Sequence, residues 1–591
     1  MKQYIKALAL GLLTAGMLTS CDDFLDRPAE SSYNADNFYQ TSDQCYAGVN
    51  YLYNSPWYDF QRGFIKVGEV MSGNYYWGSS PYLNFSVNGN DEDLKNMSYS
   101  LWAVIGHSNT VYNSLKKSPA DPAVVNQCMG ECLIWKALAY FFLARSFGDV
   151  PIIHDTSETL GSGTYNNIKK VHHADVYDYI ILTLEKAMSL MEKKNNSASG
   201  RLDYYSAEAL LAKTYLTKAG VTGTLNQDDL DKAASYAKDV IDNSGYSLME
   251  NYGDLFKLAY NKNSECLISW RWVASGSNWT RQNTLQDDLA MTGFGSQGGC
   301  WGGWNGCSVD LQEAFDVFQL ERDPSSWNAN PDTRLKATMM LPGFSYDYFR
   351  TDKGGFDYLT FIYKQGATGE LESPNGGNCV KHIYGTTADH IAGCGEGDDR
   401  MASSLATHIL RLADVYLILA ESKLHGPGSS TTDPDALAAF NTVHQRAVKN
   451  ANPATSLTWE QVWKERRLEL AMEGDRWYDF VRVSYYNPDF CVNELKTQHR
   501  GPYYGLNSVY KAYFESGNTD WSVTSSAGYD TGYDAPNVEA LMRTDAATGK
   551  KYFYLPMCQD DVIYNPNLAS TDDEGNPVEP ERVDIRATYS Y

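Results

Sequence analysis

The chain has 591 residues, a formal net charge of −24 from 49 Lys and Arg against 73 Asp and Glu, and a hydrophobic content of 43%. This apolar content excludes disorder for most of the chain, and the length suffices to bury one large core or two. The negative charge argues against nucleic acid or an anionic lipid surface as the main partner, because either requires a field of opposite sign. Aromatic residues make up 13% of the chain, so many rings should lie near the surface, where they can hold an amphipathic ligand.

The first twenty residues predict a lipoprotein signal peptide. Lys2 and Lys6 precede a mostly apolar run over Ala7–Leu18, which is too short for a membrane span of about 20 residues. The string Leu-Thr-Ser-Cys that ends at Cys21 looks like a lipobox, so Cys21 is the predicted lipid anchor. Three Asp residues follow within five positions, similar to the acidic export signal of surface lipoproteins in Bacteroidetes. We therefore expect a chain anchored in the outer membrane and facing the cell exterior.

Apolar residues recur at helical spacing over several segments in the first half of the chain. These segments predict helices at about 44–52, 101–115, 124–147, 174–191, 206–218 and 227–244. The last carries an alanine stripe for close helix contact. Paired helices of this kind resemble degenerate tetratricopeptide hairpins, without a clean 34-residue repeat.

From about 251 to 397 the sequence changes character, with Gly, Asn, Ser and Asp between short aromatic runs such as that at 267–272. This pattern predicts loops with short strands. Helices are predicted again at about 403–423, 434–449 and 459–482, and the last hundred residues are again irregular. Cys300 and Cys307 flank a Gly/Trp loop, which makes them a better disulfide candidate than Cys128 and Cys132 inside a helix; the bridge is left open.

The helix at 459–482 contains Glu465, Glu469 and Glu473 at i, i+4 spacing. Arg466 lies within reach of Glu469 or Glu473, so the charges should pair while their aliphatic stems are buried. Such a charge run is typical of a structural element and does not indicate catalysis.

Several blocks together resemble the SusD/RagB family of outer-membrane nutrient-binding lipoproteins. These are the lipobox followed by Asp-Phe-Leu-Asp, the segment 131–151 ending in Phe-Gly-Asp-Val-Pro, the runs 209–216 and 411–421, the run 465–477, and the terminal blocks 554–556 and 565–568. Trp135-Lys136 and Met557-Cys558 depart from the usual residues of the family. The blocks extend from residue 21 to 568, so the resemblance covers nearly the whole chain.

The resemblance implies a mainly α fold: a scaffold of tetratricopeptide-like helical hairpins, with long irregular loops and a few short strands that form the ligand face. It implies a signal peptide at 1–20 and a single domain at 21–591, with the scaffold at about 40–250 and 400–485 and ligand-binding loops at about 55–100 and 250–400. It also implies capture of a glycan and its delivery to a SusC-like TonB-dependent transporter. A peptide- or glycopeptide-capturing lid and a structural partner of the barrel without a ligand of its own are the alternatives.

A glycan site should combine aromatic faces, which stack on sugar C–H groups, with short polar side chains for the hydroxyls. Two loops have this composition, so we predict glycan contacts from Asn74, Tyr75, Tyr76, Trp77, Tyr82, Trp279, Arg281, Trp301 and Trp304. Trp77, Trp301 and Trp304 are favoured because their Gly and Ser neighbours can cover them little. Trp102, Trp135, Trp463 and Trp477 lie on helical patterns and are expected in the core. An anionic polysaccharide is disfavoured unless Arg281, Lys262 and their neighbours form a local basic patch.

Enzymatic motifs are absent from the sequence: there is no HExxH, GxSxG or P-loop. Gly293–Gly298 matches GxGxxG only as a string, since no βαβ pattern surrounds it. His172 and His173 are adjacent and should point to different sides of a helix, which makes them a poor metal pair. We expect no enzyme, no cofactor and no metal.

Overall fold

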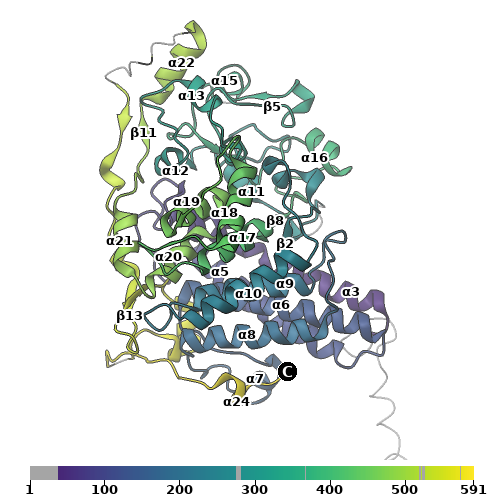
Figure 1. Ribbon diagram of the computed structural model, residues 1–591. Coiled ribbons are helices and arrows are strands. Elements are labelled where there is room, and N and C mark those ends of the chain that lie inside the picture. Colours follow the sequence, from purple (N-terminus) through teal and green to yellow (C-terminus); the bar gives the residue numbers. More distant parts are fainter. Residues whose placement is uncertain (1–37, 275–280, 367, 518–520, 522–525, 573) are drawn as a thin grey trace, which may run out of the picture.

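The computed structural model describes residues 38–274, 281–366, 368–517, 521, 526–572 and 574–591. Long helices from the first half of the chain form the lower part of the molecule in Figure 1, and loops with short helices and strands form the upper part. The C-terminal segment, yellow in Figure 1, returns along one edge to the base. The predicted signal peptide and Cys21 lie outside the described residues and stay predictions.

Helices dominate the described residues. The α-helices are α3 (Ser42–Asn50), α4 (Gln61–Ile65), α5 (Glu92–Leu115), α6 (Pro122–Phe147), α7 (Thr156–Gly161), α8 (His173–Leu190), α9 (Tyr204–Lys218), α10 (Gln227–Asn243), α11 (Leu285–Leu289), α12 (Val309–Ala314), α13 (Pro324–Asn328), α14 (Thr333–Thr338), α15 (Tyr358–Thr360), α16 (Thr387–Cys394), α17 (Leu412–Ser422), α18 (Pro434–Ala447), α19 (Trp459–Leu470), α20 (Arg476–Ser484), α21 (Pro488–Lys496), α22 (Leu506–Ser516), α23 (Gln559–Tyr564) and α24 (Ile585–Thr588). None of them is both long and apolar enough to cross a bilayer.

The strands are short and pair two by two, always antiparallel. They are β1 (Tyr75–Tyr76) with β3 (Gly306–Cys307), β2 (Cys266–Trp270) with β8 (Thr407–Arg411), β4 (Met339–Met340) with β7 (Asn378–Cys379), β5 (Ser345–Tyr346) with β6 (Phe356–Asp357), β9 (Ser430–Thr431) with β10 (Leu457–Thr458), β11 (Tyr503–Tyr504) with β12 (Gly528–Tyr529), and β13 (Met542–Thr544) with β14 (Lys551–Phe553). They join loops to one another rather than building a sheet of their own.

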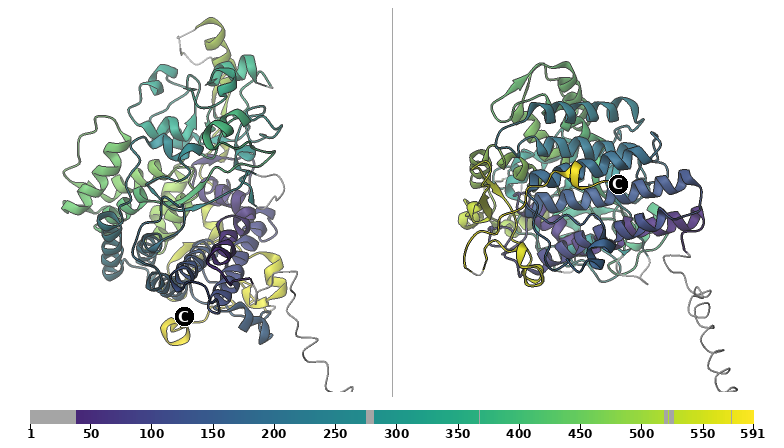
Figure 2. Two further views of the ribbon diagram at one scale, coloured as in Figure 1. Left: turned by 90° about the vertical axis from the view of Figure 1, so that its right-hand side faces the viewer. Right: turned by 90° about the horizontal axis from the view of Figure 1, so that it is seen from below.

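The long helices pack against their neighbours in chain order. Helix α5 packs on α6, α6 on α8, α8 on α9, α9 on α10, α10 on α17, and α17 on α18. Seen from below, the helices of this array lie side by side (Figure 2). The predicted mainly α fold with a helical hairpin scaffold is confirmed, and buried residues from Cys45 to Ile585 form one continuous core.

Local sequence signals set the ends of the central helix α6. Asp121 caps it by accepting a hydrogen bond from the Ala123 N–H, Pro122 occupies the first turn, and Gly148 ends it at φ 74°. A side chain at that φ would be strained, which is why glycine follows the last turn. Trp135 on this helix is fully buried, as its helical position predicted.

Three predicted helices have different bounds in the structure. The helix predicted at 101–115 is α5, which begins nine residues earlier, at Glu92. The segment predicted as a helix at 403–423 begins instead with strand β8, and helix α17 starts only at Leu412. The segment at 459–482 is not one helix, because the chain breaks between α19 and α20, where Met472 has φ 65° and Gly474 φ 73°. This left-handed turn packs against the preceding part of the chain, since a Cβ on Gly68 would lie 2.5 Å from the Gly474 backbone.

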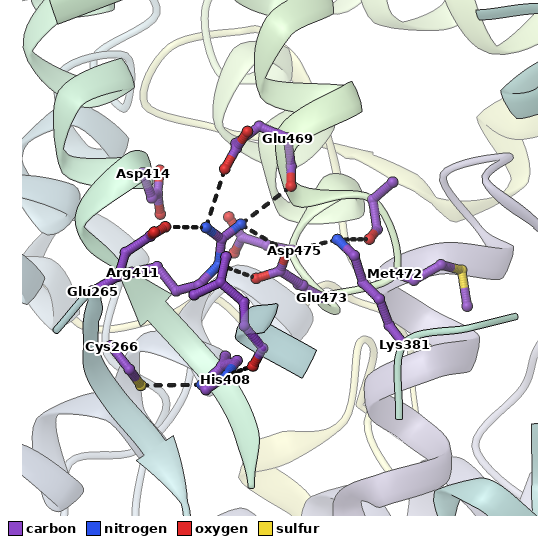
Figure 3. Close-up of polar contacts among 12 residues, drawn as sticks. Glu265, Cys266, Lys381, His408, Arg411, Asp414, Glu469, Met472, Glu473 and Asp475 are labelled. Atoms are coloured by element: carbon purple, nitrogen blue, oxygen red, sulfur yellow. Dashed lines mark hydrogen bonds and ion pairs between the residues drawn. The ribbon is translucent and has the colours of Figure 1, made fainter. Parts of the chain in front are cut away.

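A buried ion-pair network surrounds Arg411 at this break (Figure 3). The Arg411 guanidinium contacts Glu473 (Nε to Oε2, 2.7 Å), Glu469 (Nη1 to Oε1, 3.1 Å) and Glu265, and the Lys381 Nζ lies 2.8 Å from Glu473 Oε1. Burial alone would raise the pKa of Glu473, but the charges of Arg411 and Lys381 lower it to about 2. The charge run is therefore a structural element, as predicted.

Arg466 does not pair with Glu469 or Glu473, contrary to the prediction. It lies on the other side of α19, where its Nη1 is 2.7 Å from Asp414 Oδ1 and its Nη2 3.2 Å from Asp479 Oδ1. Successive helical residues point about 100° apart, so the two faces of α19 serve two separate ion-pair clusters.

Cys300 and Cys307 are free thiols, and no bridge joins them. Cys307 is fixed in β3, whereas Cys300 adopts φ 66° and packs against Gly295 and Asp287. The loop between them directs Trp301 and Trp304 outward, so the two sulfurs are held in separate buried positions.

Candidate functional site

Trp77 and Trp304 meet because strands β1 and β3 pair. Tyr75 lies opposite Cys307 and Tyr76 opposite Gly306, so Trp77, which follows β1, comes beside Trp304, which precedes β3. Their ring centroids are 6.5 Å apart with an interplanar angle of 85°. Trp304 is 47% exposed and Trp77 is half-buried. Two loops more than 200 residues apart in sequence thus form one aromatic surface.

Trp301 lies three residues before Trp304 in the same loop, and a hydrogen bond to the ion-paired carboxylate of Asp288 holds it. Its backbone N–H donates to the Asp287 carbonyl (2.9 Å), and its indole Nε1–H donates to Asp288 Oδ1 (3.0 Å). Asp288, on α11, also accepts two hydrogen bonds from Arg62, on α4, from Nη2 at 2.9 Å and from Nε at 3.2 Å. These hydrogen bonds raise the pKa of Arg62. Because a bidentate Arg–carboxylate pair has a fixed geometry, it fixes the plane of the Trp301 ring, which is 37% exposed.

We call Trp77, Trp301 and Trp304 the tryptophan platform. Lys66 lies over its inner edge, with the Nζ 4.9 Å from the Trp77 ring centroid. Gly78 lies beneath Trp304: it has φ 44°, and a Cβ there would be 2.4 Å from Trp304 Cζ3. The platform therefore presents exposed indole faces in set orientations, with cations at its edge. Such a surface suits a flat ligand with apolar faces and hydroxyl edges.

Four other residues predicted to contact a ligand are buried: Asn74, Tyr75, Tyr76 and Tyr82. Asn74 donates from Nδ2 to Glu69 Oε2 (2.9 Å), and its Oδ1 accepts from Arg467 Nε (2.8 Å). The Tyr82 hydroxyl donates to Asp91 Oδ1 (2.7 Å). Their side chains do not face a ligand, and the prediction is corrected: they hold the loop that carries Trp77.

The break between α19 and α20 supports this loop directly. Glu69 accepts from the Gly474 N–H through Oε1 (2.6 Å) and from Asn74 through Oε2 (2.9 Å). A single buried carboxylate thus joins the turn at Gly474 to the residue before β1. These hydrogen bonds fasten the loop that carries Trp77 to the helical scaffold.

Arg281 is exposed, and its carbonyl accepts a hydrogen bond from the Val273 N–H (2.8 Å). Trp279 lies outside the described residues. Arg62, Lys66 and Asp288 lie within the predicted ligand-binding regions at about 55–100 and 250–400. Sequence reasoning missed them because composition does not show which charged side chains lie against the aromatic rings. The one available signal was the Asp287-Asp288 pair just before the Gly/Trp loop.

The two adjacent histidines do not point apart as predicted. Their rings stack with centroids 4.2 Å apart, because His172 is the N-cap of α8 with extended ψ and only His173 has helical geometry. His173 Nδ1 lies 2.9 Å from Asp149 Oδ1, and Arg543 pairs with the other oxygen of Asp149. Despite burial, the bond to His173 and the charge of Arg543 hold the pKa of Asp149 well below its usual range.

The chain is similar in sequence to known protein families and to a group of relatives. The sequence model described as the SusD family matches residues 272–573, and the one described as starch-binding, associating with the outer membrane, matches residues 23–216. A SusD-like protein of Bacteroides ovatus is 31% identical over 96% of this chain and 98% of its own length.

Two solved structures extend the comparison. A crystal structure with xylogluco-oligosaccharide is 28% identical, with a TM-score of 0.72 over 92% of this chain and 100% of that one. A laminarin-binding SusD-like protein covers 77% of this chain and 93% of its own, with a TM-score of 0.55. At 23% identity the second likeness shows the fold alone.

Proposed function

The chain belongs to the SusD family, and from this premise we propose that it captures a glycan on the tryptophan platform and delivers it to a SusC-like TonB-dependent transporter in the outer membrane. We propose further that Cys21 carries the lipid anchor and that the platform faces the cell exterior. The platform is the observation that carries the proposal. Its three indoles come from two loops that the β1–β3 pairing brings together.

The chemistry of the platform favours a glycan. A pyranose ring offers a flat patch of C–H groups to an indole face, and its hydroxyls can reach the partly exposed side chain of Arg62 at the edge. The relative crystallised with xylogluco-oligosaccharide aligns over 92% of this chain, which makes that oligosaccharide the first ligand to test.

We propose binding without catalysis at this surface. Glycoside hydrolysis requires two carboxyl groups that flank the scissile bond. Asp288 is engaged by Arg62 and by the Trp301 indole, an arrangement that orients an aromatic ring rather than leaving an acid or base free for a substrate.

Calorimetric titration of the purified protein tests the proposed ligand class. The panel contains xylogluco-oligosaccharide, other neutral and acidic oligosaccharides, and a peptide digest. Saturable heat with a neutral oligosaccharide supports glycan capture. Heat from the digest alone would favour the peptide-capturing alternative, and no heat from either would favour a purely structural partner of the barrel.

Co-purification tests the proposed partner. A tagged chain extracted in mild detergent from host membranes should bring a TonB-dependent barrel with it, and a Cys21→Ala variant should lose membrane association. Recovery of the tagged chain without any barrel would contradict the delivery proposal, while leaving glycan capture to the titration.

A further inference from the structure

A hollow outside the platform has a charge unlike that of the chain as a whole. It has a volume of about 390 Å³. It is lined by the end of α3, the short helical run that follows, the loop before α9 and the two ends of the β2 region. Its cationic side chains are Arg201, Lys262 and Arg271. No Asp or Glu is among the described residues that line it. This basic lining contrasts with the net charge of −24 on the whole chain.

Two of the three cations have no internal counter-ion. Arg201 is neutralised from behind by Glu131, with Nη2 2.6 Å from Oε2. In contrast, Arg271 and Lys262 form no ion pair with any described residue. The guanidinium of Arg271 reaches the Asn261 carbonyl through Nη1, while its Nε is buried without a hydrogen-bond partner.

The position of Arg271 is set by the backbone. Its N–H donates to the Tyr53 carbonyl (2.8 Å), and its own carbonyl accepts from Asn54 Nδ2 (2.9 Å). The guanidinium lies against Gly200, where a Cβ would be 3.2 Å from Nη2. A guanidinium held in this way, with an unused N–H, matches the planar geometry of a carboxylate or a sulfate.

One short helical run joins the hollow to the support of the platform. Asn54 lines the hollow, and eight residues later Arg62 supports Trp301. The intervening run is the 3₁₀ helix Ser55–Phe60 followed by the start of α4, so the two residues are roughly 15 Å apart along it. Val273, which also lines the hollow, donates its backbone N–H to the Arg281 carbonyl. Of the two cations named from the sequence as a condition for an anionic glycan, Lys262 lines the hollow.

We propose that this hollow binds an anionic substituent of a glycan, a uronate carboxylate or a sulfate ester, while the neutral part of the same glycan lies on the tryptophan platform. The inference rests on the proposed function. The net charge restricts the ligand class further, because the negative field of the chain repels a polyanion. At physiological salt the Debye length is about 8 Å, so Arg271 and Lys262 attract only an anionic group that lies in the hollow itself. The ligand is therefore a mostly neutral glycan with sparse acidic substituents.

Matched ligand pairs test the proposal. The first pair is a xylo-oligosaccharide with one glucuronic acid and the same compound after reduction of the carboxyl to an alcohol. The second is a sulfated galacto-oligosaccharide and its desulfated form. A charged hydrogen-bonded contact should make the acidic member of one pair bind roughly tenfold to a hundredfold tighter than its neutral partner. The pair that shows the preference identifies the anion.

Variants assign the preference to the hollow. Arg271→Met and Lys262→Met should each remove most of the preference and leave the affinity for the neutral form unchanged, whereas Arg271→Lys should keep part of it. Lys511→Met, which removes an exposed cation on α22, is the matched control and should keep the full preference. Trp304→Ala should weaken both members of the pair equally.

Two results would overturn the inference while leaving the proposed function in place. One is equal binding of acidic and neutral members in both pairs. The other is a preference that persists in Arg271→Met and Lys262→Met. A wild-type protein that binds no glycan of any kind would contradict the proposed function itself, and the inference with it.

Discussion

Replacing Trp304 by Ala separates ligand binding from loop packing at the platform. A Trp side chain buries about 150–250 Å² when fully enclosed, and Trp304 is 47% exposed. The substitution therefore removes roughly 100 Å² of buried apolar surface, which lowers the free energy of unfolding by about 2–3 kcal/mol at 25 cal/mol per Å². With about 2.1 cal/mol/K of unfolding entropy per residue, a chain of this length should melt only roughly 2 °C lower.

The effect on binding should be larger. A lost stacking ring costs roughly 1–3 kcal/mol by analogy with base–aromatic stacking, which corresponds to about fivefold to 150-fold in affinity. Calorimetric titration with the best neutral oligosaccharide measures this loss, and thermal denaturation measures the stability.

A matched variant serves as the control. Trp102 on α5 is also half-buried and packs against Tyr140 with ring centroids 6.3 Å apart. Trp102→Ala should lower the melting temperature by a similar amount without changing the affinity. The reasoning is refuted if Trp304→Ala binds the oligosaccharide as tightly as wild type, or if Trp102→Ala loses affinity equally.

Two further predictions concern the supports of the platform, and a third concerns the buried ion-pair network around Arg411. Asp288→Asn should weaken oligosaccharide binding several-fold in titration with little change in melting temperature, because it disrupts the ion pair that orients Trp301; unchanged affinity would show that the orientation is unimportant. Gly78→Ala should destabilise the fold by roughly 1–3 kcal/mol through its positive φ and also displace Trp304, so the loss of affinity should accompany the fall in melting temperature. Glu473 has its pKa lowered from 4.5 to about 2, so its contribution of roughly 3 kcal/mol is present above pH 4.5 and lost as the pH falls toward 2. Glu473→Gln should be less stable at neutral pH but show a flatter acid profile in thermal denaturation, and an equally steep profile would contradict the assignment.

The helical scaffold was predictable from the sequence because its signals are local. Helix α6 follows from its apolar content between Asp121-Pro122 and Gly148, and helix α10 from its alanine stripe and its N-cap. The break at Met472–Gly474 was not predictable, because the flanking residues have continuous helical spacing and the turn is stabilised by contacts with Gly68 and Glu69. Tertiary contacts outweighed the local preference there.

The candidate site was predictable only in part, since composition identifies aromatic loops but does not say which rings face out. Trp301 and Trp304 are exposed because neighbouring glycines lie under or beside them, a signal present in the sequence. Tyr75 and Tyr82 stand in an equally polar segment, yet the β1–β3 pairing and the hydrogen bond to Asp91 bury them. Arg62 and Asp288 come from separate segments that only the fold brings together.

A crystal structure of the protein with the tightest-binding neutral oligosaccharide tests the central claim most directly. We expect a sugar ring stacked on Trp301 or Trp304, with hydroxyls within hydrogen-bond distance of Arg62. Density for the oligosaccharide elsewhere on the chain, with the three indoles left bare, would contradict that claim.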